Sequence, residues 1–333
     1  MKKSLIALAV LASTGAAMAQ SSVTLYGIID VNLQSAKAND LRKTLLESGG
    51  INGSRWGLKG AEDLGGGLKA VFNLESGFNV DTGTGKAGSI FNRQSYVGLA
   101  GSFGEFDFGN TGTAYDDTAI NSDPLWDGLL APAYTVWQNG AAYNGKPGNM
   151  IKYSSPSFGG VTVAASYALG ENKTATTSAK GVAAVNVQYT GGPLYLSLAY
   201  QEDSKAHNAA GATGAASYKD VLFNASYDLG VVKLEGSYNQ NTTDLDLKSN
   251  QFQFGVDVPV GPALVLSTGY AYSKDKDTNG VSGTKRDGLG LGAKYSLSKR
   301  TFVYTGAMRA QSKPAVGEKV KTDIYTIGLN HSF

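Results

Sequence analysis

The sequence has 333 residues, of which 29 are basic and 27 acidic, and it has no cysteines. This near balance of charge excludes a strong electrostatic field for nucleic acid, and a chain without disulfides must rely on a large core or a closed sheet. Gly is abundant at 44 residues and Pro is scarce at 8, a composition that suits many strands joined by tight turns.

Residues 1–19 have the pattern of a cleaved export signal. Lys2 and Lys3 precede the short apolar run Leu5–Ala12, and Ala17-Met18-Ala19 has the small-x-small form that signal peptidase cuts. The alternative, a membrane anchor, is disfavoured because this run is too short to span about 30 Å of hydrocarbon. We therefore expect an exported mature chain, residues 20–333, that forms one domain.

Beyond the signal, the sequence is a series of short segments in which apolar and polar residues alternate. In Phe252–Val258, for example, every second residue is apolar, which is the period of a strand with two unlike faces. Residues 34–52 are mostly polar and are expected to form a loop. The expected strands lie in 23–33, two arms of 53–80, 91–101, 105–110, 149–156, 161–169, 182–190, 194–201, 221–229, 231–240, 251–258, 264–273, 288–295, 301–311 and 322–333.

The connections between these segments are alternately tight and long. Gly191-Gly192 and Leu229-Gly230 are tight, whereas residues 203–217 and 274–286 form long polar loops. This predicts an all-β transmembrane antiparallel up-and-down barrel of about 16 strands, with its tight turns toward the periplasm. The alternative, a secreted sandwich, is disfavoured because many tyrosines lie near segment ends, where girdles at the lipid interfaces belong.

The longest break in the alternation is residues 111–148. This stretch contains Asp116, Asp117, Asp123 and Asp127, together with several Pro and Gly residues. A structureless loop of this length needs somewhere to pack. The bore of a wide barrel provides that place, so we expect the loop to fold inward and to form the acidic side of a pore constriction.

Basic residues of the early hairpin are expected to line the bore opposite this loop. Arg55 and Lys59 share one face of their strand, and Lys69 joins them across the turn. Cations that face carboxylates across a narrow section set ion preference and orient dipolar solutes. The alternative is that these are ordinary charges in a water-filled bore.

Six stretches resemble the general trimeric porins of β-proteobacterial outer membranes. They are SSVTLYG (21–27), SRWGLKGAEDLGGGLKA (54–70), FNRQSYVGL (91–99), YSSPSFGG (153–160), LSKRT (297–301) and HSF (331–333). The resemblance runs from one end of the mature chain to the other. It implies a homotrimer of 16-stranded barrels, each with the loop after its fifth strand folded into the bore, and passive diffusion of ions and small hydrophilic solutes.

The resemblance also implies roles for individual residues. Arg55 and Arg93 match wall arginines that face the inserted loop in that family, and Lys146 stands where the family has a third basic residue, Arg. This Lys and the four loop aspartates leave the ion preference open. The terminal Phe333, at the end of an apolar alternation, resembles the signal read by the barrel-assembly machinery. Outer-membrane lipids and lipopolysaccharide are further expected partners.

Other functions remain as alternatives. Trp126, Tyr134 and Trp137 would supply stacking surfaces in a substrate-specific channel, and a non-transport adhesin or structural barrel is a third class. The sequence has only two histidines and shows neither a Ser/His/acid set nor metal-ligand spacing. We therefore expect no enzyme activity, no metal, no cofactor and no nucleic-acid partner.

Overall fold

A computed structural model describes residues 22–85, 88–119, 121–137, 143–171, 173–176, 179, 181–204, 217–244, 247–277 and 282–333. The predicted export signal, residues 1–19, therefore lies outside the described residues. In the described part, seventeen strands form one antiparallel sheet. They are β1 (Ser22–Ala38), β2 (Leu41–Ser48), β3 (Arg55–Gly65), β4 (Leu68–Gly77), β5 (Gln94–Gly101), β6 (Gly104–Asn110), β7 (Met150–Ser154), β8 (Val161–Ala168), β9 (Val182–Gly191), β10 (Leu194–Asp203), β11 (Tyr218–Asp228), β12 (Lys233–Thr243), β13 (Leu247–Val260), β14 (Leu264–Asp277), β15 (Ser282–Ser296), β16 (Thr301–Lys313) and β17 (Val320–Ser332).

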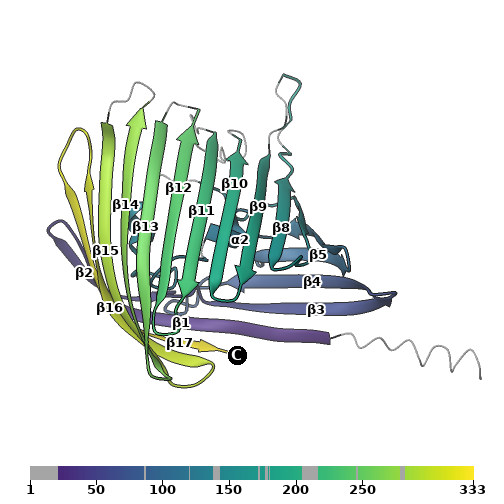
Figure 1. The fold of residues 1–333 in the computed structure, drawn as a ribbon, viewed down its shortest axis with the longest axis horizontal. Helices are drawn as coiled ribbons and strands as arrows, with labels where there is room; N and C mark the ends of the chain where they lie inside the picture. Colours follow the sequence, from purple (N-terminus) through teal and green to yellow (C-terminus); the bar gives the residue numbers. More distant parts are fainter. Residues whose placement is uncertain are drawn as a thin grey trace, which may run out of the picture.

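The sheet closes on itself because the first and last strands pair. Ile28–Ala38 of β1 pairs with β17, and the two strands run side by side in Figure 1. Phe333 continues this pairing through two backbone hydrogen bonds with Gly27. β2 and β3 both pair with β1, one along each half, so they share one position and the seventeen described strands occupy sixteen positions in the ring. The predicted closed barrel is confirmed.

The expectation of a loop at residues 34–52 is wrong. β1 continues to Ala38, turns at Asn39 with a φ of 51°, and pairs with β2 along eight residues. The polar composition of this segment hid the hairpin, although Ala36 packs against the buried apolar cluster inside the barrel. Apart from the turn at residues 39–40, the stretch without strand structure is residues 49–54, between β2 and β3.

The barrel has apolar residues outside and polar residues inside, the reverse of a soluble sandwich. On β13, Phe252 and Phe254 are 48% and 55% exposed, whereas Gln251 and Gln253 are 0% and 6% exposed. The outward surface is exposed in the isolated chain and matches a lipid environment. Two tyrosines expected near the interfaces instead face inward: Tyr26 bonds to Glu75, and Tyr304 bonds to the buried Asp30.

The apolar core lies inside the barrel, between the wall and residues 111–149. This inserted segment follows β6, which occupies the fifth position in the ring, and carries two short helices, α2 (Asp116–Ala119) and α3 (Pro132–Val136). Its apolar side chains pack on the inner wall, where one buried cluster joins loop and strand residues. That cluster comprises Leu125, Leu130, Ala131, Ala133, Val136, Ala271, Met308, Ala310 and Ile324.

Candidate functional site: the constriction

The inserted loop is fastened to one side of the barrel by hydrogen bonds from consecutive strands. On β9, Asn186 donates to the Ala114 carbonyl over 2.5 Å, and on β11 Asn224 donates to the Thr118 carbonyl over 2.7 Å. Each strand from β8 to β14 supplies at least one wall residue that bonds the loop, among them Ser166, Asn186, Gln201, Asn224, Asn239, Gln253, Ser267 and Ser273. The loop therefore lines this side, and the open part of the bore lies toward β1–β5.

A row of glycines on β15 lets the loop approach the wall closely. Gly288, Gly290 and Gly292 face inward, while Leu289 and Leu291 face outward with about half of their surface exposed. A Cβ atom added at Gly290 would lie 2.2 Å from the Leu130 carbonyl oxygen. These inward glycines provide the space into which the apolar side chains of the loop fit.

The tip of the loop has an unusual backbone. Leu125, Trp126 and Asp127 have φ values of 65°, 66° and 54°, so three consecutive non-glycine residues are in the left-handed region. Each costs roughly 1–3 kcal/mol unless surrounding contacts impose it. The Leu125 amide donates to Ser267 on one side of this turn, and the Leu129 amide donates to the Gly50 carbonyl on the other.

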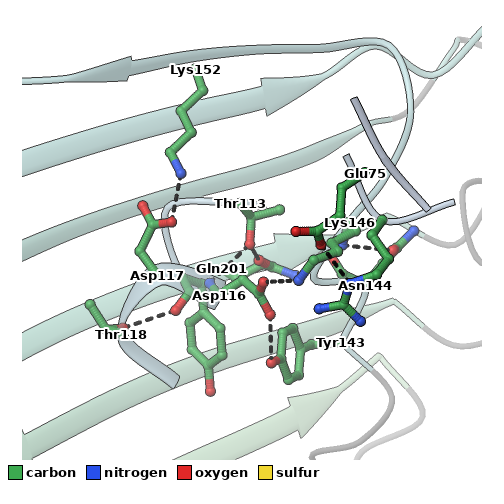
Figure 2. Close-up of polar contacts among 12 residues, drawn as sticks. Glu75, Thr113, Asp116, Asp117, Thr118, Tyr143, Asn144, Lys146, Lys152 and Gln201 are labelled. Atoms are coloured by element: carbon green, nitrogen blue, oxygen red, sulfur yellow. Dashed lines mark hydrogen bonds and ion pairs between the residues drawn. The ribbon is translucent and has the colours of Figure 1, made fainter. Parts of the chain in front are cut away.

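Two of the four loop aspartates are paired with lysines. Lys146 Nζ lies 2.6 Å from Asp116 Oδ2, and the Tyr143 hydroxyl donates to Asp116 Oδ1 over 3.1 Å. On β7, Lys152 Nζ lies 2.6 Å from Asp117 Oδ1. Figure 2 shows the two lysines approaching the base of the loop from different sides. Burial raises the pKa of Asp117, and the ammonium of Lys152 opposes that rise.

The other two aspartates lie nearer the tip and form no ion pair within the part of the chain that the structure describes. Asp123 is partly buried and its Oδ1 atom lacks a hydrogen-bond partner there; burial raises its pKa well above the ordinary value. Asp127 reaches the water of the bore, but the surrounding barrel excludes much bulk solvent and raises its pKa to about 6. Asp127 is thus a loop acid whose charge changes near pH 6.

The wall arginines lie together around one carboxylate that was not among the candidates predicted from the sequence. Arg93 Nε is 2.6 Å from Glu75 Oε1, and Arg55 Nη1 is 4.0 Å from the same atom. The Tyr26 hydroxyl donates to Glu75 Oε2 over 2.9 Å. Glu75 is almost fully buried, so it neutralises part of the arginine charge. In the sequence, the feature that could have identified Glu75 is its position on the polar face of its strand, which it shares with Lys69 and Asn73.

The two wall lysines lie at different heights. The registers place Arg55, Lys59 and Asp63 on one face of β3, and pair Lys59 with Asn73 and Asp63 with Lys69 on β4. Lys59 lies over the Tyr26 ring, 5.2 Å from its centroid. Lys69 lies beside the tight turn, about 20 Å along β4 from Glu75 at a rise of about 3.3 Å per residue, and is therefore remote from the arginines.

The three aromatic residues considered for sugar stacking do not form a continuous surface. The Trp126 ring is covered by Lys294 Nζ, 4.6 Å from its centroid. Trp137 packs against the buried loop clusters, and only Tyr134 is largely exposed, at 72%. This arrangement disfavours a specific sugar channel.

Neither a metal centre nor a spanning helix is found in the described part of the chain. No group of three or more His, Cys, Asp or Glu residues there could hold a metal ion. No described helix is long and apolar enough to cross a bilayer.

Known proteins match this chain over nearly its whole length. The family model described as Gram-negative porin matches residues 4–315. Outer membrane porin protein 32 of Delftia acidovorans is 38% identical to this chain, and the alignment spans 95% of this chain and 91% of that protein. An outer membrane porin protein of Bordetella pertussis is 31% identical, with 100% of both chains covered.

Solved structures give the same result. An anion-selective porin from Comamonas acidovorans matches with a TM-score of 0.80 at 30% identity, over 94% of this chain and 100% of that one. A trimer form of OmpT of Vibrio cholerae matches with a TM-score of 0.74 at 16% identity, over 94% of this chain and 99% of that one. This more distant similarity concerns the fold alone.

Proposed function

The chain belongs to the Gram-negative porin family, and from this premise we propose that it is a general diffusion porin whose constriction favours anions weakly. The family is non-enzymatic, and its members are outer-membrane channels for passive diffusion. The finer proposal concerns the solutes that pass and the charge that selects them.

The observation that carries the proposal is the distribution of charge around the open part of the bore. Arg55 and Arg93 share the carboxylate Glu75, which leaves a formal charge of +1 (2 − 1) on these three side chains. Asp116 and Asp117 are each paired with a lysine, so these pairs are formally neutral. Lys59 adds a further positive charge, and Asp127 opposes it only above a pH of about 6. The relative described as anion-selective supports the same sign.

The loop supports selection by size rather than by chemical identity. It fills one side of the bore, and its aromatic residues are mostly packed. Swelling of liposomes that contain the purified protein, with sugars of increasing size, tests this directly. We expect uptake rates that fall smoothly with size. Saturation by one sugar would indicate a substrate-specific channel, and no uptake would indicate an adhesin or structural barrel.

The sign of selectivity is tested by the reversal potential across a planar bilayer in a potassium chloride gradient. We expect a potential that indicates faster passage of chloride at neutral pH. A potential of the opposite sign would contradict the proposed charge distribution and leave the diffusion function intact.

We further propose that the mature chain starts at Gln20 and assembles as a homotrimer. The export pattern of residues 1–19 supports the first part, and the solved trimer form of OmpT, which shares the fold, supports the second. Mass spectrometry of the purified protein checks the first residue. Electrophoresis in mild detergent with and without heating checks the assembly, and migration as a monomer without heating would contradict the trimer.

Phe333 is proposed to direct assembly in the membrane. Its side chain lies on the outer face of the last strand and is 44% exposed, where an assembly factor has access to it. Deletion of Phe333 is expected to reduce the amount in the outer membrane more than it reduces the heat stability of protein refolded in detergent. A normal amount in the membrane would contradict this role.

A further inference from the structure

One buried carboxylate in the barrel collects five hydrogen-bond donors. Asp30 on β1 is 0% exposed. Its Oδ1 atom accepts from the Gly50 amide and the Tyr304 hydroxyl, over 2.9 and 2.6 Å. Its Oδ2 atom accepts from two further backbone amides, of Ile51 and Asn52, and from the Asn330 side chain over 2.8 Å. Such a concentration of bonds to one ion stabilises the backbone that supplies them.

The backbone that Asp30 holds is the interruption between β2 and β3, residues 49–54, which we call the ledge. Besides the side-chain bonds, the Gly49 amide and the Ser54 hydroxyl both donate to the Asp30 carbonyl, over 2.9 and 3.0 Å. A Cβ atom at Gly50 would lie 2.0 Å from the Tyr304 hydroxyl oxygen, so the ledge fits tightly against the inner wall. One residue of β1 therefore fixes both ends and the middle of the ledge.

The ledge touches the constriction loop next to its strained tip. The Leu129 amide donates to the Gly50 carbonyl over 2.7 Å. A Cβ atom at Gly128 would lie 2.8 Å from the Gly50 carbonyl oxygen and 3.0 Å from Ile51 Cα. The left-handed turn at residues 125–127 is thus pinned between the wall, through Ser267, and the ledge. Strained backbone persists only where its surroundings over-determine it, so release of one side would favour a different loop position.

We propose that Asp30 is a positioning residue for the pore. Through the ledge it holds the tip of the constriction loop against the wall, and this keeps the channel open and makes spontaneous closures rare. Asp30 acts without contacting the solute, because its carboxylate is buried. This inference rests on the proposed role of the loop as the constriction, and it adds the element that controls spontaneous closure.

Asp30→Asn tests the proposal with little change in volume. An amide nitrogen would replace one acceptor oxygen and face at least one backbone N–H group of the ledge, so that bonds on that side are lost. In planar bilayers we expect at least about a fivefold increase in closures per channel at a fixed voltage. A folded, heat-modifiable variant that closes no more often than the wild-type protein would overturn the proposal.

Glu235→Gln is the matched control. Glu235 is another buried carboxylate of the inner wall, 4% exposed, and its hydrogen-bond partner is Lys233 of the same strand rather than the ledge. The same change of charge in the bore should leave the closure rate unchanged. An equal rise in closures for both variants would show that charge, and not the ledge, controls closure, and would also overturn the proposal.

A reversible crosslink keeps the test independent of whether Asp30→Asn folds. The chain has no cysteines. Ile51 Cγ1 occupies the position that a cysteine sulfur would take, and the Gly128 Cβ position lies 3.3 Å from it. The two side chains are therefore within reach of a disulfide once the backbone shifts to relieve the 2.8 Å contact of that Cβ with the Gly50 carbonyl oxygen. With Gly128→Cys and Ile51→Cys, we expect fewer closures when oxidised than when reduced. The crosslink should also lower the closure rate of the Asp30→Asn variant. Equal closure rates in both redox states would contradict the proposal.

The reversal potential recorded in the same bilayers separates this proposal from the proposed ion preference. If the wild-type channel does not prefer anions, the proposed charge distribution of the constriction is wrong, and the proposal about Asp30 is not affected. The comparison of closure rates would remain valid, since it depends only on an open channel.

Discussion

At the scale of the residue, the proposed constriction contains charged side chains that partly neutralise one another. Glu75 holds two guanidiniums, and its own position is fixed by the Tyr26 hydroxyl. Its near-complete burial makes it a stronger local determinant than its single charge suggests, because screening by salt is weak away from open water.

Glu75→Gln should increase the preference for anions. The substitution removes the one carboxylate that offsets Arg55 and Arg93, and raises the formal wall charge from +1 to +2. We expect the permeability ratio of chloride to potassium to rise roughly threefold, which corresponds to less than about 1 kcal/mol. Reversal potentials in a salt gradient measure this ratio.

Asp63→Asn is the control, because Asp63 carries the same charge beside the tight turn, where it pairs in register with Lys69. It should leave the ratio nearly unchanged. A larger effect of Asp63→Asn than of Glu75→Gln would mean that the tight-turn end, and not the arginine wall, selects ions.

Asp127 should make the ion preference depend on pH. Its pKa is raised to about 6, above the ordinary value of about 4, so the carboxylate is charged at pH 7.5 and neutral at pH 5. Anion preference should therefore increase as the pH falls through 6. Reversal potentials at both pH values check this, and Asp127→Asn should remove the change. A change that persists in Asp127→Asn would assign it to another group.

The same shift has a consequence for stability, with a definite sign. Because folding raises the pKa of Asp127, the folded chain holds the proton more tightly than the unfolded chain does. The contribution of Asp127 is most favourable below a pH of about 4 and declines as the pH rises through the folded pKa. Melting curves of Asp127→Asn should show less loss of stability between pH 4 and pH 7 than those of the wild-type protein.

At the scale of the element, the loop and the strands under it fit one another. The inward glycines of β15 alternate with outward leucines. The strand therefore has bulky side chains on its outer face, toward lipid, and no side chains on the part of its inner face that packs against the loop. In a sequence read alone, this GLGLG run indicates a strand, but only the structure assigns the inner face to the loop.

Gly290→Ala tests this packing. The added methyl group would lie 2.2 Å from the Leu130 carbonyl oxygen and 2.5 Å from Leu125 Cδ1, so the loop must move. We expect a loss of about 1–3 kcal/mol in stability and an altered size cutoff in liposome swelling. Gly148→Ala, where a Cβ atom meets nothing within 4 Å, should leave both unchanged; similar effects of the two substitutions would refute the packing account.

At the scale of the whole molecule, the fold was largely predictable from the sequence, because strict alternation is imposed on a strand that has lipid on one side and water on the other. The hairpin of β1 and β2 was missed because its many polar residues mask the alternation, although Leu33 and Leu46 pair as exposed leucines and Ala36 packs on the inner apolar cluster. The inward Tyr26 and Tyr304 were missed because a tyrosine near a strand end suits both a lipid interface and a polar bore.

The site was predictable only in part. The positions of the loop and of the residues around Arg55 follow from spacing and from the family resemblance, but pairing partners are set by three-dimensional register. The sequence could not reveal that Asp116 and Asp117 face lysines, that Glu75 joins the arginines, or that Asp30 supports residues 49–54. These contacts join residues that are far apart in the chain, by 18 positions for Arg93 and Glu75 and by 274 for Tyr304 and Asp30.

The most direct test of the central claim is the reversal potential of Arg55→Ala combined with Arg93→Ala. This variant changes the formal wall charge from +1 to −1, while both positions remain in contact with the bore. In about 0.1 M salt we expect the permeability ratio to shift roughly tenfold toward cations, and the shift to shrink in 1 M salt, where the screening length falls to about 3 Å. An unchanged potential at low salt, in a variant that still folds and conducts, would contradict the assignment of this wall as the selective face of the pore.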